Sequence, residues 1–161
     1  NTKPNRSNMK TKFLLPLLFV ILSTGTLWSQ NTETFTLKLD HMALSVKDLD
    51  RSVDFYKNVL KLSEITNLTK KEGIRWISLG DGKELHLVST IKEPVTINKA
   101  VHVAFKVTNF EALITKLQNL NITYSDWPGT LDKITVRADG IKQIYIQDPD
   151  GYWIEINSVE K

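Results

Sequence analysis

Cysteine is missing from all 161 positions of the sequence, and its absence excludes one form of membrane attachment. Lipid anchoring through a diacylglyceryl-cysteine requires a cysteine after an apolar leader segment, and this chain offers none. A chain without thiols also suits an oxidising compartment, where free cysteines react or pair. The sequence is therefore compatible with export and lacks this kind of lipid anchor.

Acidic residues are absent from the first 29 positions, which carry the basic residues Lys3, Arg6, Lys10 and Lys12. The whole chain has 21 Lys and Arg against 18 Asp and Glu, a net charge of +3. Leaving out these four gives 21 − 4 = 17 basic against 18 acidic residues, a net charge of −1. The remaining chain lacks the excess positive charge of nucleic-acid binders, and we expect no nucleic-acid partner.

Apolar runs are short, and the longest, FLLPLLFVIL at 13–22, follows the basic stretch MKTK at 9–12. About 10 residues at about 1.5 Å each cannot cross a hydrocarbon layer about 30 Å thick. A basic start and a short apolar core are typical of a signal peptide. We expect residues 1–29 to be leader and signal peptide, with 1–8 upstream of the true start. The protein is then periplasmic or secreted, with no stable membrane anchor after cleavage. A buried or anchoring helix is the alternative.

After a polar linker at 30–36, the pattern predicts a single domain over 37–161, made of a module at 37–90 and a module at 100–158. Each module shows one strand pattern, then helical spacing, then three short strand patterns. Asp48 is expected to cap the first helix. The expected strands are 37–46, 62–69, 74–80, 84–90, 100–107, 122–126, 132–138, 142–147 and 152–158, and the expected helices are 48–60 and 109–120. The fold class is therefore α+β, with two βαβββ modules that bury their faces against each other.

The two modules repeat each other in sequence. WISLGDGKELHLVS at 76–89 lies over YIQDPDGYWIEINS at 145–158 without a gap, and this alignment puts His86 on Glu155. The first strands of the two modules also match, and there His41 is equivalent to His102. The repeat therefore places metal-binding residue types at equivalent points.

All three histidines of the chain and one glutamate are predicted to lie on the same class of strand face. Side chains alternate across a strand, and His41, His86, His102 and Glu155 each fall opposite the apolar face. Each histidine alone would be an ordinary strand residue. Four such groups on one face require a concave, partly wet surface, since they would not be buried unpaired. Together they predict a metal site for one divalent transition metal, Zn, Ni, Co, Fe or Mn.

Four segments resemble the glyoxalase I branch of the vicinal oxygen chelate superfamily, which also includes bleomycin resistance proteins and dioxygenases. They are LDHMALSVKDLDRSVDFYKNVL, ELHLV, VHVAF and the terminal QDPDGYWIEI, and the resemblance covers residues 38–158. It implies a curled, cup-shaped mixed sheet with the helices on its outer face. It also implies that His41, His86, His102 and Glu155 are the metal ligands. Dimers of this branch often share each site between two chains, so we expect a homodimer, and an intra-chain site stays open.

The resemblance implies an exported metal-dependent lyase or isomerase. Its small substrate would chelate the metal through adjacent oxygens, and a proton would move through an enediolate. Glu155 is then the proton shuttle and His86 its catalytic helper. His86 departs from the family pattern, because well-studied isomerases carry Glu or Gln there. The sequence does not identify the substrate or show whether a thiol cofactor is used.

Six further residues are candidates for substrate contact. Four aromatic residues would form walls of the pocket, Trp76, Trp127, Tyr145 and Trp153, and Arg75 or Arg137 would hold an anionic group. Packing between modules is the alternative for the aromatic residues, and a solvated surface is the alternative for the arginines.

Rival functions come from the same fold. A metal-free small-molecule (drug) binding module generally lacks such ligands, and the complete set argues against it. A ring-cleaving dioxygenase uses two histidines and one glutamate around Fe(II), and a fosfomycin-modifying thiol transferase uses a similar set. The fourth ligand at His86 argues against both.

Overall fold

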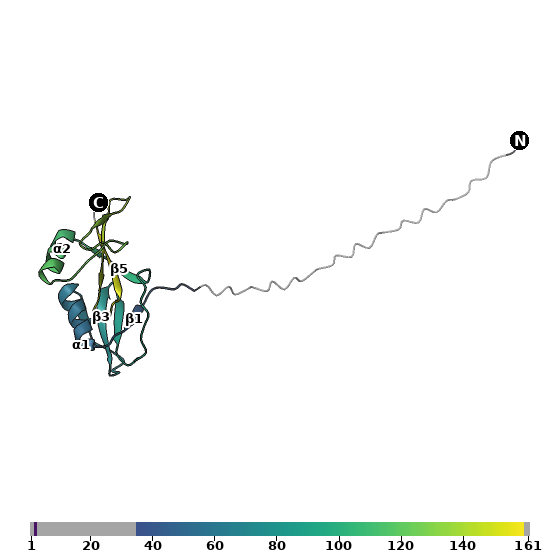
Figure 1. The fold of residues 1–161 in the computed structure, drawn as a ribbon. Helices are drawn as coiled ribbons and strands as arrows, with labels where there is room; N and C mark the ends of the chain where they lie inside the picture. Colours follow the sequence, from purple (N-terminus) through teal and green to yellow (C-terminus); the bar gives the residue numbers. More distant parts are fainter. Residues whose placement is uncertain (1, 3–34, 160–161) are drawn as a thin grey trace. The chain divides into compact units, whose positions relative to one another are not determined.

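The computed structural model of the chain describes residue 2 and residues 35–159. The folded unit begins at Leu37 (Figure 1). The expected leader lies outside the described residues, apart from residue 2, and so does most of the expected linker at 30–36. Within the part of the chain that is described, no helix is long and apolar enough to cross a membrane.

The first module contains four strands and one helix that changes type midway. Its elements are β1 (His41–Ser45), α1 (Leu49–Asp54), the π-helix η1 (Phe55–Val59), β2 (Ser63–Ile65), β3 (Ile74–Gly80) and β4 (Lys83–Val88). The second module repeats this order with β5 (His102–Val107), α2 (Phe110–Asn119), β6 (Thr135–Val136), β7 (Lys142–Gln147) and β8 (Trp153–Ser158). The α+β class and the two βαβββ units are confirmed.

Each module forms one four-stranded mixed sheet, and the two sheets have the same strand order. The orders are β1-β4-β3-β2 and β5-β8-β7-β6. In both sheets the first strand pairs in parallel with the last, and the other pairings are antiparallel. The register repeats as well, since Trp76 lies opposite His86 and Tyr145 lies opposite Glu155. The alignment of the two sequence copies is therefore an alignment of structure.

A single hydrophobic core joins the two modules on the helix side of the sheets. It contains Val53 and Tyr56 from the first helix, Leu117 from α2, and buried strand residues such as Leu85 and Ile154. Figure 1 shows α1 and α2 on the same side of the strands. The apolar strand faces thus pack on the helices as predicted. We call the opposite face, which carries His41, His86, His102 and Glu155, the inner face.

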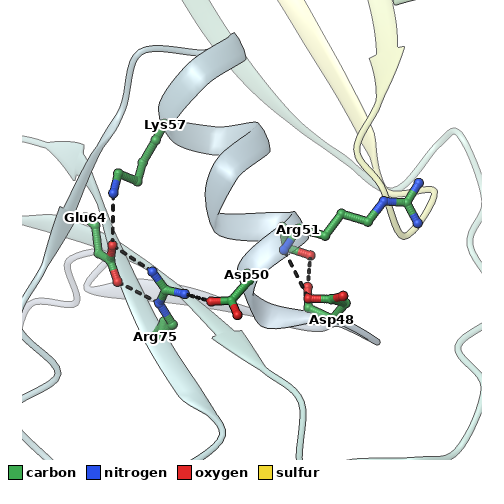
Figure 2. Close-up of polar contacts among 7 residues, drawn as sticks. Asp48, Asp50, Arg51, Lys57, Glu64 and Arg75 are labelled. Atoms are coloured by element: carbon green, nitrogen blue, oxygen red, sulfur yellow. Dashed lines mark hydrogen bonds and ion pairs between the residues drawn. The ribbon is translucent and has the colours of Figure 1, made fainter.

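Side-chain caps fix where the two helices begin. The Asp48 carboxylate accepts a hydrogen bond from the Arg51 amide at 3.1 Å, as Figure 2 shows. Asn109 accepts from the Ala112 amide at 2.9 Å at the start of α2. Both satisfy an amide that the first helical turn leaves without a backbone acceptor. The predicted cap at Asp48 is confirmed, whereas the change to π-helix at Phe55 was not predicted.

Several strands are shorter than the alternation predicts. β1 begins at His41, and Leu37 and Leu39 before it are 88% and 67% exposed. β4 begins at Lys83, and the Glu84 amide donates to the Asp40 carbonyl at 3.2 Å, so residues 37–39 have no part of β4 beside them. The prediction at 122–126 is wrong, because only Ser125 makes isolated bridges there. The strands expected at 62–69 and 132–138 shrink to β2 and β6.

Polar contacts from the β7–β8 turn tie the second module to the first. The Tyr56 hydroxyl donates to Asp148 at 2.9 Å, and the Ser52 hydroxyl donates to Asp150 at 2.9 Å. Tyr152 donates its hydroxyl to the Ser45 carbonyl at 3.0 Å. Burial is the main cause that raises the pKa of the Asp148 carboxyl group. The terminal DPDG turn is therefore a structural link between modules.

Candidate functional site

The first pair of predicted ligands lies on the inner face of the first sheet. Ala43 in β1 lies opposite His86 in β4. His41 is two residues before Ala43 and faces the same side of the sheet, so its ring lies beside the His86 ring. The two rings stack with centroids 4.2 Å apart and planes 13° apart. Trp76 stacks on the His86 ring at 4.3 Å and 5°. The indole thus holds the imidazole ring in one orientation.

Neighbouring carboxylates decide which nitrogen of each ring in this pair carries a proton. Asp40 Oδ2 lies 2.7 Å from His41 Nδ1, and Glu84 Oε2 lies 2.8 Å from His86 Nε2. Since an ionised carboxylate only accepts, each of these nitrogens is the donor. His41 Nε2 and His86 Nδ1 are then available as acceptors. A carboxylate behind an imidazole is the arrangement that orients histidine ligands in metal sites.

The second pair of predicted ligands lies on the inner face of the second sheet. His102 Nε2 is 3.1 Å from Glu155 Oε2. The same carboxylate accepts from the Tyr145 hydroxyl at 2.6 Å and from the Asn157 amide at 2.7 Å. Glu155 is only 8% exposed. Its burial is therefore compensated by donors on β7 and β8.

A hydrogen bond on the far side of the His102 ring determines which nitrogen faces Glu155 without its own proton when the ring is neutral. Its Nδ1 lies 2.9 Å from the carbonyl oxygen of Lys99, which only accepts, so Nδ1 carries the proton. A neutral ring then turns the lone pair of Nε2 toward the Glu155 carboxylate. Two acceptors 3.1 Å apart repel each other unless a second proton or a metal cation lies between them.

Glu155 stays ionised more readily than an ordinary glutamate. Burial, the largest influence, raises its pKa, but hydrogen bonds from Tyr145, Asn157 and Gln143 and the charge of His102 outweigh burial. The pKa of Glu155 therefore lies below its usual value. Burial also raises the pKa of Tyr145, and the carboxylate adds to this effect, so the hydroxyl remains a donor. The pair offers an anionic oxygen and an imidazole nitrogen at one point.

The four predicted ligands do not meet within one chain. Among the described residues, no group of three or more His, Cys, Asp or Glu side chains is arranged to hold a metal ion. Each sheet instead supplies one pair, which we call the His41–His86 half-site and the His102–Glu155 half-site. A four-ligand site would need one half-site of each kind.

Residues 38–156 match the family model of the Glyoxalase/Bleomycin resistance protein/Dioxygenase superfamily. The chain belongs to this superfamily. A metallothiol transferase FosB from Shouchella clausii is 30% identical over 122 residues, covering 74% of this chain and 79% of its own. A lactoylglutathione lyase from Pseudomonas aeruginosa is 24% identical over 149 residues, covering 73% and 80%. The solved structure of oxidase ChaP-H2 shares the fold, with a TM-score of 0.65 at 22% identity, over 77% of this chain and 94% of its own.

The two arginines predicted to bind an anionic group, Arg75 and Arg137, lie in different places. Arg75 points to the helix side, where its guanidinium donates to Glu64 at 2.7 Å and also to Asp50 (Figure 2). It does not join either half-site. Arg137 is paired with Asp139 at 2.8 Å, and its charge reaches Tyr145 and lowers the pKa of that phenol slightly against the stronger effects of burial.

The aromatic candidates all lie at the half-sites. Trp76 is buried against His86, and its Nε1 has no hydrogen-bond partner among the described residues. Trp127 is 49% exposed and lies edge-on to His102, with ring centroids 6.2 Å apart. Tyr145 lies edge-on to His102 at 5.6 Å. These three aromatic candidates therefore lie beside the predicted ligands.

Sequence reasoning missed the side chains that hold the ligands in place. Asp40 and Glu84 are bonded to the two histidines of the first half-site, and Asn157 is bonded to Glu155. Period-two spacing gives the signal for two of them, since Glu84 and Asn157 are each two residues from a ligand on the same strand face. Lys99 lies between the two predicted modules, and nothing in its spacing indicates its position.

Proposed function

We propose that the protein is an exported metal-dependent lyase or isomerase of the glyoxalase type. Its substrate is a small molecule that chelates the metal through adjacent oxygens. The observation that carries the proposal is the His102–Glu155 pair, in which His102 Nε2 lies 3.1 Å from the carboxylate while its Nδ1 bonds to a backbone carbonyl. With the ring neutral, Nε2 and the carboxylate would both offer lone pairs to a divalent cation at this point.

The donor set fits a transition metal. Two histidines on one half-site and a histidine with an ionised carboxylate on the other are ligands that Zn, Ni, Co, Fe(II) and Mn accept. Three of the four ligand side chains are backed by Asp40, Glu84 or the Lys99 carbonyl, as expected for oriented imidazoles. When bound, the metal would supply Lewis-acid polarisation of a substrate carbonyl.

The protein's own groups would move the proton. Glu155 is ionised, 8% exposed and held by Tyr145, so its carboxylate is positioned to take a proton from a substrate carbon and return it to the adjacent carbon. His86 would assist from the other half-site. Tyr145 would keep the carboxylate aligned as its charge changes, and Trp127 would limit access of water from the open side.

The division of the predicted ligands into two half-sites supports a homodimer as part of this proposal. Each chain would supply a His41–His86 half-site to one centre and a His102–Glu155 half-site to the other. A two-fold arrangement closes with two equal centres per dimer. Export to the periplasm or outside the cell remains part of the proposal because of the leader sequence alone.

Metal content tests the proposal. Protein starting at residue 30, purified without a histidine tag and offered each metal separately, should bind about one transition metal per chain. Glu155→Gln should lose most of this uptake, because it removes the anionic ligand while keeping its shape. Glu111→Gln is the matched control, since Glu111 pairs with Lys142 on the exposed side of α2. Wild-type protein that takes up none of the metals would contradict the proposal and favour a metal-free binding module.

A substrate panel separates the chemistries that the superfamily hosts. α-Hydroxycarbonyl compounds with solvent-deuterium exchange as the readout detect proton transfer next to a carbonyl. Catechols with oxygen consumption detect ring cleavage, and fosfomycin with small thiols detects thiol transfer. Deuterium exchange that is lost in Glu155→Gln is the expected result. Oxygen uptake or thiol adducts without exchange would replace the proposed reaction by the corresponding rival.

A further inference from the structure

Lys99 places a positive charge beside the His102–Glu155 half-site. Its backbone carbonyl accepts from His102, and its ammonium group lies 4.6 Å from the centroid of the Tyr145 ring and 4.5 Å from that of Trp153. The Trp127 ring is 5.9 Å away. The charge is thus fixed among the aromatic side chains that surround the candidate ligands.

The ammonium group is held in place by neutral oxygens. It donates to the carbonyls of Asp126 and Trp127 at 2.6 Å and 3.1 Å, and to the Ser125 hydroxyl at 3.2 Å. Within the described part of the chain, no ion pair involves Lys99. The Asp126 carboxylate is turned instead to Lys133, at 3.1 Å, and to backbone amides of its own turn. The positive charge of Lys99 is therefore oriented, and the Asp126 carboxylate compensates it only through space, without direct contact.

Space for a ligand adjoins this charge. A pocket of about 240 Å³ has Ser125, Tyr145 and Trp153 in its lining, together with apolar residues such as Ile122 and Leu131. Lys99 is outside this lining and reaches the pocket through its contacts with Ser125, Tyr145 and Trp153. Ser125 makes the longest of the three hydrogen bonds, and its hydroxyl can turn to donate. An anion entering from this pocket would take the place of the Ser125 oxygen and accept from both groups.

We propose that Lys99, with Ser125 and the surrounding aromatic rings, forms a subsite for an anionic substituent of the substrate, namely a carboxylate, sulfonate or phosphonate. This rests on the proposed function only in assigning the anion to the molecule that meets His102 and Glu155. The substrate class is then a small acid with adjacent metal-chelating oxygens. Neutral α-hydroxycarbonyl compounds of the same size would be poor substrates.

The test compares methanesulfonate with methanesulfonamide, which has nearly the same shape but no charge. Both are titrated into metal-free protein with tryptophan fluorescence as the readout, since Trp127 and Trp153 flank the charge. Wild type should bind the anion about tenfold more tightly or better, the change expected for one charge-assisted contact. Lys99→Met should bind the two alike, and Lys99→Arg should keep the preference. Lys83→Met, at the start of β4, is the matched control.

Each result decides one question. Equal affinities for the two probes in wild type, no binding of either, or an unchanged preference in folded Lys99→Met would overturn the subsite. The wild-type comparison holds even if Lys99→Met does not fold. Metal uptake is measured separately. If wild type takes up metal but shows no preference for the anion, the subsite alone is rejected. If wild type takes up no metal but prefers the anion, and Lys99→Met loses that preference, the metal chemistry alone is rejected.

Discussion

Tyr145→Phe isolates the hydrogen bond that holds Glu155. The variant keeps the ring, which is 4% exposed, and removes the hydroxyl that donates to the carboxylate at 2.6 Å. A hydrogen bond to a charged group contributes about 1.5–3 kcal/mol, and its loss leaves a buried carboxylate with one donor fewer. We expect the metal-free variant to be less stable by about 2 kcal/mol at pH 7.

Urea denaturation measures this loss. With a slope of about 2 kcal/mol per molar urea, the midpoint of unfolding should fall by about 1 M. The sign of the pH effect follows from the lowered pKa of Glu155. The stability that this group contributes is complete above its unfolded pKa, about 4.3, and is lost as pH falls through the lower folded value. The difference between wild type and variant should therefore shrink below about pH 4.

Two results would refute this reasoning. Equal midpoints at pH 7 would mean that the phenol does not stabilise an ionised carboxylate. A difference that persists unchanged to about pH 3 would mean that the hydroxyl acts through another partner. Asn157→Ala supplies a comparison, because it removes a second donor to the same carboxylate and should show the same trend with pH.

Other perturbations test the rest of the structure. Tyr56→Phe removes the buried hydrogen bond to Asp148 between the modules and should cost about 1.5–3 kcal/mol in urea unfolding, whereas an unchanged midpoint would deny the link. Gly73→Ala should cost about 1–3 kcal/mol by the same assay, because φ is +74° and the new Cβ would lie 2.6 Å from the Thr90 methyl group; full stability would show that the turn adapts. Arg75→Met should change stability by about 1 kcal/mol or less and leave metal uptake intact, and lost uptake would place this arginine at the centre.

Strand periodicity predicted the parts of the fold that packing enforces. The bounds of β3 and β7 agree with the expected 74–80 and 142–147, and Ile77 and Ile144 are fully buried on the helix side. In these strands the apolar face can be buried only against the helices, so alternation predicts both the strand and the direction in which each side chain faces. The same rule placed the four predicted ligands on the inner face.

Periodicity failed where the partner strand decides the outcome. Leu37 and Leu39 alternate like strand residues, yet β4 provides no backbone beside them. Arg75 is a different case, because it shares a strand face with Ile77, which packs toward the helices. There the strand spacing itself indicates the helix side and not the inner face. Lys99 could not be found in this way, because its position depends on contacts with a turn more than 25 residues away.

Subunit mixing tests the central claim most directly, that two half-sites from different chains make one metal centre. One variant carries His41→Ala and His86→Ala, and the other carries His102→Ala and Glu155→Ala. Each alone should bind almost no metal. Heterodimers, isolated with two different tags that contain no histidine, should hold about one metal per dimer, because one of their two centres regains all four ligands. Metal-free heterodimers made from two folded variants would contradict the shared centre.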